Sequence, residues 1–320
     1  MENWYRPISD DLDIVDRNII SVLRSGRPEL QEMCDYVTSS GGKKIRPAIC
    51  ILSHYICGGT KTEEIRNIAT AFEMIHTATL VHDDINDKSE VRRGRITVHK
   101  KYTVSKAVIL GDFIFAMGFK FIGSAERKII DTVTEASTAM AESEFIQKEF
   151  EHRPAVTEKD YMDIIKGKTA MPISACARAG ATLAGADDAT VNALASFALS
   201  IGTAFQIVDD VLDIIGNSEA TGKKIGTDIM EGKPTLPIIY AMADPVSGNK
   251  IKEIFKKDEV SEKDLQDALD AIRKTDAAER CLAKAKEMVE NAIPMLSELG
   301  DPVFRGSLTG LARYIVSRDR

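Results

Sequence analysis

The sequence predicts an all-α protein, and three observations lead to this fold class. Apolar residues recur at helical spacing from the first segment onward, where over residues 9–25 they are Leu12, Val15, Ile19, Val22 and Leu23. Capping residues, acidic first turns and glycine breaks separate one such segment from the next. No pattern of period 2 persists anywhere, and neither an internal repeat nor a disordered linker is recognisable. We therefore expect a single domain over residues 1–320, a helical bundle of roughly ten or more helices.

Composition is ordinary for a globular protein and argues against a nucleic-acid surface. The 320 residues include 42 Lys and Arg against 49 Asp and Glu, a formal net charge of −7, which is the wrong sign for binding nucleic acid. Hydrophobic residues make up 44% and charged residues 28% of the chain, which is ordinary for a soluble globular protein. The length allows two domains but also one large domain.

Cysteine usage and the N-terminus point to the cytoplasm. The five cysteines form no C-x-x-C pair, so neither a disulfide framework nor a zinc site is indicated, and we expect reduced thiols, mostly in the core. Residues 1–7 lack a basic segment followed by an apolar one, and no run of about 18 apolar residues occurs. We expect a cytoplasmic protein that is not secreted and has no transmembrane segment.

The first 87 residues contain four expected helices. Ser9 with the two following aspartates is an expected N-cap and acidic first turn, and that helix stops near Gly26. Further helices are expected over residues 29–37, 47–56 and from a cap at residues 60–64 through to Asp87. Three basic residues, Lys43, Lys44 and Arg46, stand directly before the helix at 47–56, where backbone N–H groups and the helix dipole favour an anion. A solvated basic turn is the alternative.

The rest of the chain continues the helical pattern. Helices are expected over residues 106–122, 126–150, from a Thr157 cap into residues 166–170, over 188–215, and over 249–298, where charge-rich helices show no chemistry. Residues 216–233 are rich in glycine and lysine. They suit a mobile loop that covers a phosphate, although a solvated turn is equally possible.

An acidic cluster ends the helix before residue 88. Asp83 and Asp87 are an i,i+4 pair, so their carboxylates project from one helix face, with Asp84 beside them. Such like charges repel each other unless a cation joins them. Mg²⁺ prefers a few carboxylate oxygens plus substrate phosphates, at roughly 2.0–2.1 Å. One such cluster alone is a weak signal, because acidic helix ends are common.

A second copy of the cluster makes the signal strong. Asp209, Asp210 and Asp213 lie within the apolar run of residues 205–215. Carboxylates in apolar surroundings are costly unless they are paired or bound to metal. The two clusters therefore predict Mg²⁺ and, through it, a phosphorylated ligand.

Basic residues complete the predicted site. Those that would surround two multiply charged anions are Lys43, Arg46, Arg92, Arg93, Lys168, Lys223 and Lys233. The chain has no G-x-x-x-x-G-K-[ST], G-x-G-x-x-G or G-x-S-x-G motif, so nucleotide hydrolysis, hydride transfer and serine hydrolysis have no support. Departure of a diphosphate assisted by Mg²⁺ has the best support.

With these motifs the sequence resembles the trans-isoprenyl diphosphate synthases, or polyprenyl synthetases. The resemblance runs from the glycine-rich basic stretch at residues 41–47 to residues 311–314 near the end. It implies the isoprenoid synthase fold, an all-helical bundle around a deep central cavity, in which the two aspartate-rich helices face each other across the cavity mouth. It also implies a homodimer.

The resemblance also assigns roles to single residues. Asp83 and Asp87, with Asp84 beside them, would bind about two Mg²⁺, and Asp209, with Asp210 and Asp213, a further one, so about three Mg²⁺ per active site. The allylic diphosphate would contact Arg92, Lys168, Lys223 and Lys233. Isopentenyl diphosphate would bind Lys43, Arg46, His76 and Arg93. Thr169 and Gln206 match positions of the allylic site that line the path of the developing cation.

The implied mechanism needs no side-chain nucleophile. The allylic diphosphate ionises, the isopentenyl double bond attacks the cation, and a proton is lost to the departed diphosphate. The absence of a Ser/His/Asp set therefore fits. One departure from the family is Lys44, where arginine is frequent, and it affects none of these assignments.

Product length follows from the floor of the cavity. The positions four and five residues before Asp83 lie roughly 6–7.5 Å down the helix, and family members with short products tend to carry a bulky aromatic there. This chain has Thr79 and Ala78 instead, so Met74 or Ile75 would form a deeper floor, with Phe115 opposite. We expect a product of about five to eight isoprene units, near the lower end. If a residue from another helix fills the gap, the product stops at about four units.

Other functions remain open at this point. A geranylgeranyl or farnesyl diphosphate synthase has the same motifs and a shorter product. A terpene cyclase shares the first aspartate motif and the helical fold but normally lacks the second motif and the Lys43/Arg46 pair. A non-catalytic subunit of a heteromeric synthase typically loses aspartates, whereas both clusters are complete here. A purely structural helical protein would need neither cluster.

Overall fold

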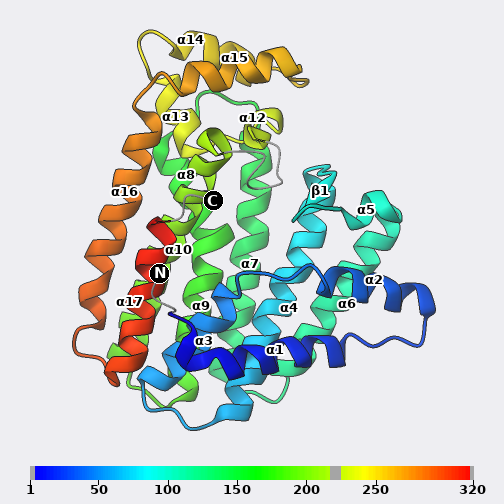
Figure 1. The fold of residues 1–320 in the computed structure, drawn as a ribbon, viewed down its shortest axis with the longest axis vertical. Coiled ribbons are helices and arrows are strands. Elements are labelled where there is room, and N and C mark those ends of the chain that lie inside the picture. Colours follow the sequence, from blue (N-terminus) through cyan, green and yellow to red (C-terminus); the bar gives the residue numbers. More distant parts are fainter. Residues whose placement is uncertain (1–3, 217–224, 318–320) are drawn as a thin grey trace. The chain divides into compact units, whose positions relative to one another are not determined.

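The computed structural model describes residues 4–216 and 225–317, and the chain forms two compact units (Figure 1). The first comprises Met1–Glu135, Ala175–Ala195 and Leu296–Gly310; the second comprises Ala136–Ser174, Ser196–Met295 and Leu311–Arg320. The single domain expected over residues 1–320 stays a prediction.

The described elements are almost all helices, which confirms the all-α fold class. Those of the first unit are η1 (Arg6–Ile8), α1 (Ser9–Val22), α2 (Pro28–Thr38), α3 (Ile45–Ile56), α4 (Thr62–Asn86), β1 (Val91–Arg92), β2 (Arg95–Ile96), α5 (Val98–Lys101) and α6 (Val104–Ile122). Those with residues in both units are α7 (Arg127–Phe150), α9 (Met171–Leu183), α10 (Asp188–Ile215), η3 (Ile293–Leu296) and α17 (Pro302–Val316). Those of the second unit are α8 (Glu158–Ile165), η2 (Lys166–Ala170), α12 (Thr227–Met230), α13 (Leu236–Met242), α14 (Gly248–Phe255), α15 (Glu262–Ile272) and α16 (Ala277–Ala292).

Helix α4 is the centre of the first unit. It packs against α1, α3 and α6, so more than one side of the helix is covered. Its fully buried side chains include Ile65, Met74 and Ala78. A helix covered in this way offers little room for charge, which makes each polar residue on it informative.

Helices α3 and α9 approach closely within the first unit. A Cβ added to Gly180 of α9 would lie 2.1 Å from the carbonyl oxygen of Cys50. The Nδ1 atom of His54 lies 3.2 Å from the Gly180 carbonyl oxygen. Only glycine leaves room for the α3 backbone at this point.

We expect Gly180→Ala to destabilise the protein by about 3 kcal/mol, because backbone atoms cannot yield as a flexible side chain does. The melting temperature should fall by roughly 5 °C or more. The control is Gly306→Ala in α17, where an added Cβ would have no neighbour within 4 Å and alanine should stabilise the helix by up to about 1 kcal/mol. Equal melting temperatures for the two variants would refute the close approach.

The second unit has a core of its own around α13. This helix packs against α8, α14, α15 and α16, and the apolar cluster there includes Ile238, Phe255 and Ile272. At the start of α8 the expected cap is present: Thr157 and Asp160 form a reciprocal capping box. This box fixes the beginning of the helix that leads into residues 166–170.

Some predicted details are wrong. Ser9 lies inside α1 and its hydroxyl donates to the Arg6 carbonyl, so it is not the N-cap. No side-chain cap forms at the start of α4, although its acidic first turn is present. The loop expected over residues 216–233 contains the short helix α12, and a small hairpin, β1–β2, was not expected. Of the residues in that loop, 217–224 lie outside the described part of the chain.

Helix α10 is notable for its length and apolar character. Among the described residues it is long and apolar enough to cross a membrane, and 61% of its most apolar stretch is buried inside the protein. A buried core helix has the same signature. The expectation of no transmembrane segment therefore stays a prediction.

Candidate active site

The first aspartate cluster lies at the C-terminal end of α4. Asp83 and Asp87 are half-buried, whereas Asp84 is only 4% exposed. Arg92 donates from Nε to Asp84 Oδ1 at 2.6 Å. Burial raises the pKa of the Asp84 carboxyl, and the positive charge of Arg92 opposes that rise. Asp84 therefore anchors an arginine, while Asp83 and Asp87 share the face predicted for metal.

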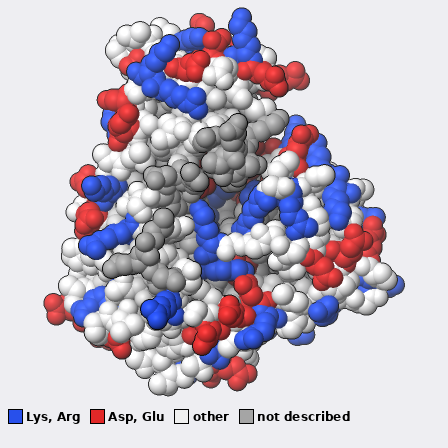
Figure 2. All heavy atoms as spheres, viewed as in Figure 1, with Lys and Arg blue, Asp and Glu red and all other residues white. Residues whose placement is uncertain are grey.

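A two-strand hairpin holds Arg92 in place. Strands β1 and β2 pair antiparallel, with Arg92 opposite Arg95. The two turn residues, Arg93 and Gly94, have φ of 51° and 73°, as a tight hairpin turn requires. Arg95 Nη1 donates to the Tyr36 carbonyl oxygen at 3.1 Å and packs on the Tyr36 ring. Figure 2 shows basic side chains gathered over the part of the face that the hairpin and α5 occupy.

The structure brings three of the four residues predicted for isopentenyl diphosphate together. Burial lowers the pKa of His76 well below its usual range, and the positive charges of Arg46 and Arg93 act in the same direction. The guanidinium of Arg93 packs on Gly42, where an added Cβ would lie 3.1 Å from Nη2. The fourth residue, Lys43, follows Gly42 and is exposed. Arg46 and Arg93 therefore lie beside His76 on α4, as predicted for an anion site.

A buried carboxylate inside this basic group was not predicted. Glu73 of α4 is 5% exposed, and Lys44 Nζ lies 3.6 Å from its Oε1. The negative charge of Glu73 opposes the fall in pKa that burial causes at Arg46 and Arg93. Glu73 therefore offsets the mutual repulsion of the cations. The sequence signal was a lone glutamate in the apolar run of residues 71–75.

We expect His76 to make the protein less stable in mild acid. The folded state holds His76 neutral because its pKa is lowered, whereas the unfolded chain takes up a proton below about pH 6.5. Stability from this group is therefore present above that pH and is lost as the pH falls, by at most about 1.4 kcal/mol per pH unit. Between pH 7.5 and 5.5 the melting temperature of His76→Gln should fall less than that of the wild type. Parallel curves would contradict this expectation.

The residues predicted to set product length lie where α4 meets α6. Met74 and Ala78 are fully buried, Ile75 is 6% exposed, and Thr79 is half-buried. A Cβ added to Gly118 of α6 would lie 3.2 Å from Ile75 Cγ1. Because Gly118 has no side chain, α6 can approach this stretch of α4 closely.

A cavity of about 220 Å³ lies on a neighbouring face of α4 in the first unit. Thr77 and Val81 line it from α4, and Ile19 and Val37 from α1 and α2. Glu73, Asp84, Arg92 and Arg93 also line it. The cavity therefore lies beside the arginines predicted for the two diphosphates, on a face of α4 other than that of Asp83 and Thr79.

The second aspartate cluster lies near the end of α10 in the second unit. Asp210 is 5% exposed and accepts hydrogen bonds from the Tyr161 hydroxyl at 2.6 Å and from Gln206 Nε2 at 2.7 Å. Burial raises the pKa of Asp210 to about 7, and the negative charges of Asp209 and Asp213 add to the rise. Asp209 is half-buried. As in the first cluster, one aspartate is buried and bonded to neighbouring side chains.

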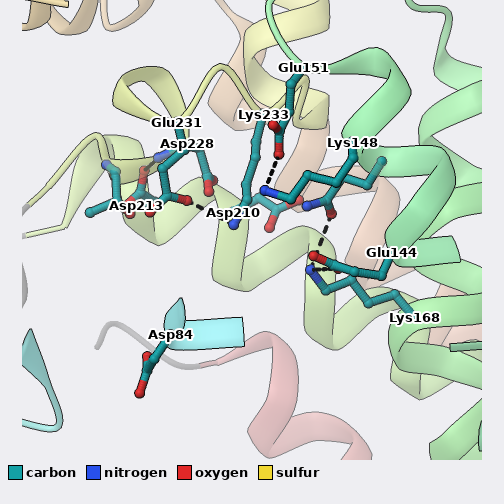
Figure 3. A network of polar contacts seen from close by, with 12 residues as sticks. Asp84, Glu144, Lys148, Glu151, Lys168, Asp210, Asp213, Asp228, Glu231 and Lys233 are labelled. Atoms are coloured by element: carbon teal, nitrogen blue, oxygen red, sulfur yellow. Dashed lines mark hydrogen bonds and ion pairs between the residues drawn. The ribbon is translucent and has the colours of Figure 1, made fainter. Parts of the chain in front are cut away.

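Asp213, in the last turn of α10, holds the start of α12. Its carboxylate accepts from the Thr227 hydroxyl at 2.7 Å and from the backbone N–H groups of Thr227 and Asp228 at 3.2 and 3.1 Å. Burial, together with the charges of Asp213 and Asp210, raises the pKa of Asp228 well above its usual range, while Lys233 opposes it. Asp228, which we did not predict, thus belongs to the carboxylate cluster (Figure 3).

The predicted lysines of the second unit are paired with acids. Lys168 Nζ lies 2.5 Å from Glu144 Oε2, and Lys233 Nζ lies 2.8 Å from Glu231 Oε2 (Figure 3). Lys223, predicted as a third cation, lies outside the described residues.

Lys168 and Thr169 belong to a π-helical turn. Residues Lys166–Ala170 form η2 between α8 and α9, and such turns are frequent at functional sites. Thr169 donates to Gln206 Oε1 at 2.8 Å. A Cβ at Gly167 would lie 1.9 Å from Ser143 Oγ, so α7 passes directly against the turn. The turn thus brings Thr169 to Gln206 and Lys168 to Glu144.

The donor set fits Mg²⁺. Within residues 4–216 and 225–317, no three Asp, Glu, His or Cys side chains converge as a ready-made metal site. Mg²⁺ does not require one, since it is usually held by one or two carboxylates, waters and substrate phosphates. The i,i+4 pair Asp83 and Asp87 provides such carboxylates, and Asp209 provides another.

Comparison with known proteins identifies the family. Residues 27–272 match the family model "Polyprenyl synthetase". The all-trans-nonaprenyl-diphosphate synthase (geranyl-diphosphate specific) of Rhodobacter capsulatus is 34% identical, with 98% of this chain and 96% of that protein covered. The octaprenyl diphosphate synthase of Escherichia coli is 34% identical, with 98% and 97% covered.

A solved structure agrees with these sequence matches. The polyprenyl synthase of Caulobacter crescentus, complexed with calcium and isoprenyl diphosphate, has a TM-score of 0.94 and 32% identity, with 99% of this chain and 97% of that chain covered. The family predicted from the motifs is confirmed, and this chain belongs to the polyprenyl synthetase family.

Proposed function

We propose that this chain is a Mg²⁺-dependent trans-prenyltransferase that condenses isopentenyl diphosphate with an allylic diphosphate (geranyl, farnesyl or geranylgeranyl). One observation carries the proposal: helix α4 bears an aspartate cluster at its C-terminal end and, two turns earlier, a histidine that lies among arginines. The charges of Glu73 and Asp83 both act on Arg46, so the carboxylates and the cations of this site lie close together. A metal-bound diphosphate beside a cation-bound diphosphate is the arrangement that such a site would serve.

The allylic diphosphate would be held through the aspartates and their nearby cations. Asp83, Asp87 and Asp209 would hold about three Mg²⁺, with Asp84, Asp210 and Asp213 fixing the surroundings. Bound Mg²⁺ would neutralise the charge that develops on the leaving diphosphate. Arg92, Lys168, Lys223 and Lys233 would contribute further positive charge. Support comes from the bonds of Arg92 to Asp84 and of Lys168 to Glu144, which restrain both cations.

Isopentenyl diphosphate would bind at the basic group of the first unit. Arg46, Arg93 and Lys43 would hold its diphosphate, and neutral His76 would donate a hydrogen bond from its ring. Glu73 would keep the empty site from carrying excess positive charge.

The reaction then needs the two substrates to be held in position, and it needs no side-chain nucleophile. The allylic C1–O bond breaks, the isopentenyl C4 carbon forms a bond to C1, and a proton leaves C2 for the departed diphosphate. Thr169 and Gln206 would face the cation with oxygen lone pairs. Their role is electrostatic, so no covalent enzyme intermediate is required.

The proposed product is an all-trans chain of about five to eight units, geranylfarnesyl to octaprenyl, because small or flexible residues line α4 below Asp83. The two curated relatives named above carry eight- and nine-unit products in their names, which favours a long product over a geranylgeranyl or farnesyl one. We propose a homodimer in the cytoplasm, with the chain acting as one domain. The alternative in which the chain is not itself an enzyme is a non-catalytic subunit of a heteromeric synthase.

The test is diphosphate release by the purified chain. Release should require isopentenyl diphosphate, an allylic primer and Mg²⁺ together, and should stop when EDTA is added. Release from the allylic primer alone would indicate a lyase instead, and no release under any condition would favour the non-catalytic subunit.

A further inference from the structure

Tyr161 is a buried tyrosine whose polar end has a single defined partner. It lies on α8 and is 2% exposed, and its hydroxyl donates to Asp210 Oδ2 at 2.6 Å. A buried tyrosine hydroxyl needs such a partner, and a bond to a carboxylate is among the stronger ones. Asp210 lies on α10, so this bond ties two helices of the second unit together.

The other oxygen of Asp210 fixes an amide. Gln206, one turn earlier on α10, donates from Nε2 to Asp210 Oδ1 at 2.7 Å. Because Asp210 Oδ1 accepts from Nε2, the NH₂ end of Gln206 faces Asp210. The amide oxygen of Gln206 then faces Thr169, whose hydroxyl donates to it at 2.8 Å. The chain of bonds from Tyr161 to Thr169 has one consistent set of donors and acceptors.

We propose that Tyr161 is a positioning residue of the allylic site: by holding Asp210, it fixes which end of the Gln206 amide faces Thr169. The inference rests on the proposed function, which gives Gln206 and Thr169 their place beside the allylic cation. With both oxygens of Asp210 engaged, Asp210 cannot rotate, and Gln206 has one orientation. Without the Tyr161 hydroxyl, Asp210 can rotate toward other donors, and the amide loses its fixed orientation.

The variant that isolates this role is Tyr161→Phe, which removes one hydroxyl and keeps the ring. Its matched control is Tyr240→Phe: Tyr240 also donates to a carboxylate, Glu158 Oε2, at 2.8 Å in the same unit. We expect Tyr161→Phe to lower kcat by roughly 10–100-fold, with an unchanged KM for isopentenyl diphosphate. Tyr240→Phe should keep kcat within about twofold at a similar loss of melting temperature.

A double-mutant cycle separates positioning from general packing. In a Gln206→Ala background, Tyr161→Phe should lower kcat by no more than about twofold, because the residue through which it acts is gone. Fully additive losses of kcat would overturn the proposal. So would a Tyr161→Phe variant with the kcat of the wild type or of Tyr240→Phe.

A second variant reaches the same network without changing Tyr161. Asp210→Ala removes both oxygens to which Tyr161 and Gln206 donate, so both bonds are lost. We expect a kcat loss that Tyr161→Phe does not deepen. Turnover of the wild type, measured first, tests the proposed function separately: an inactive wild type would overturn both claims, whereas an active wild type with an unimpaired Tyr161→Phe variant would overturn only the role of Tyr161.

Discussion

Asp83→Ala should lower kcat by about 10³-fold or more, because it removes a carboxylate from the predicted metal pair. The fold should survive, since Asp83 is half-buried at the end of α4. Removing one of two like charges at i,i+4 should even relieve a few tenths of a kcal/mol of repulsion with Asp87. The same loss of turnover is expected for Asp209→Ala in the second cluster. Steady-state turnover and melting temperature measure the two effects.

The control for this prediction is Asp112→Ala. Asp112 lies on α6 in the same unit as Asp83, and its side chain is 70% exposed. It should keep the turnover of the wild type. Near-normal turnover of Asp83→Ala would refute the metal assignment, whereas a large fall in its melting temperature would mean that Asp83 is a structural residue.

Thr79→Phe should shorten the product to about four units or fewer. Thr79 lies four residues before Asp83, on the same face of α4 and roughly 6 Å down the helix, so an aromatic ring there would close the path of the growing chain. The product length should change strongly, whereas the rate of the first condensation should change little, because a short prenyl tail ends above the ring. Chromatography of the dephosphorylated products measures both.

Thr77→Phe is a closely matched control for Thr79→Phe. Both threonines are half-buried on α4, and both hydroxyls donate to a carbonyl oxygen of the preceding turn at 2.8 Å. Thr77, however, lines the cavity of about 220 Å³ on the neighbouring face, beside Arg92 and Arg93, so its added ring enters that cavity, where we expect it to raise KM and not to block the path below Asp83. Thr77→Phe should keep the product length of the wild type. Equal shortening by both variants would show that general repacking of α4, and not a floor, sets the length.

The parts of the site that follow from local pattern were predictable. The position of both aspartate clusters at the ends of apolar helices follows from periodicity alone. The i,i+4 relation of Asp83 and Asp87 needs only helical geometry. The gathering of Arg46, His76 and Arg93 was implied by family resemblance, and the charges that act on His76 now support it.

The parts that depend on tertiary neighbours were not predictable. The hairpin that brings Arg92 to Asp84 has strands of two residues each, too short for any alternating pattern, and its only cue is Arg93-Gly94. The bond from Tyr161 to Asp210 joins residues that are 49 positions apart in the sequence, so no local pattern indicates it. The partner of a buried polar group is fixed by packing, which a single sequence does not contain.

The measurement that tests the central claim most directly is the length of the product. The purified chain would be incubated with Mg²⁺, isopentenyl diphosphate and, in separate reactions, geranyl, farnesyl or geranylgeranyl diphosphate, and the dephosphorylated products would be sized. We predict all-trans products of about five to eight units that stop at the same length with each primer. Products that stop at about four units would contradict the open floor below Asp83 but keep the enzyme class. No product with any primer would contradict the proposed prenyltransferase itself.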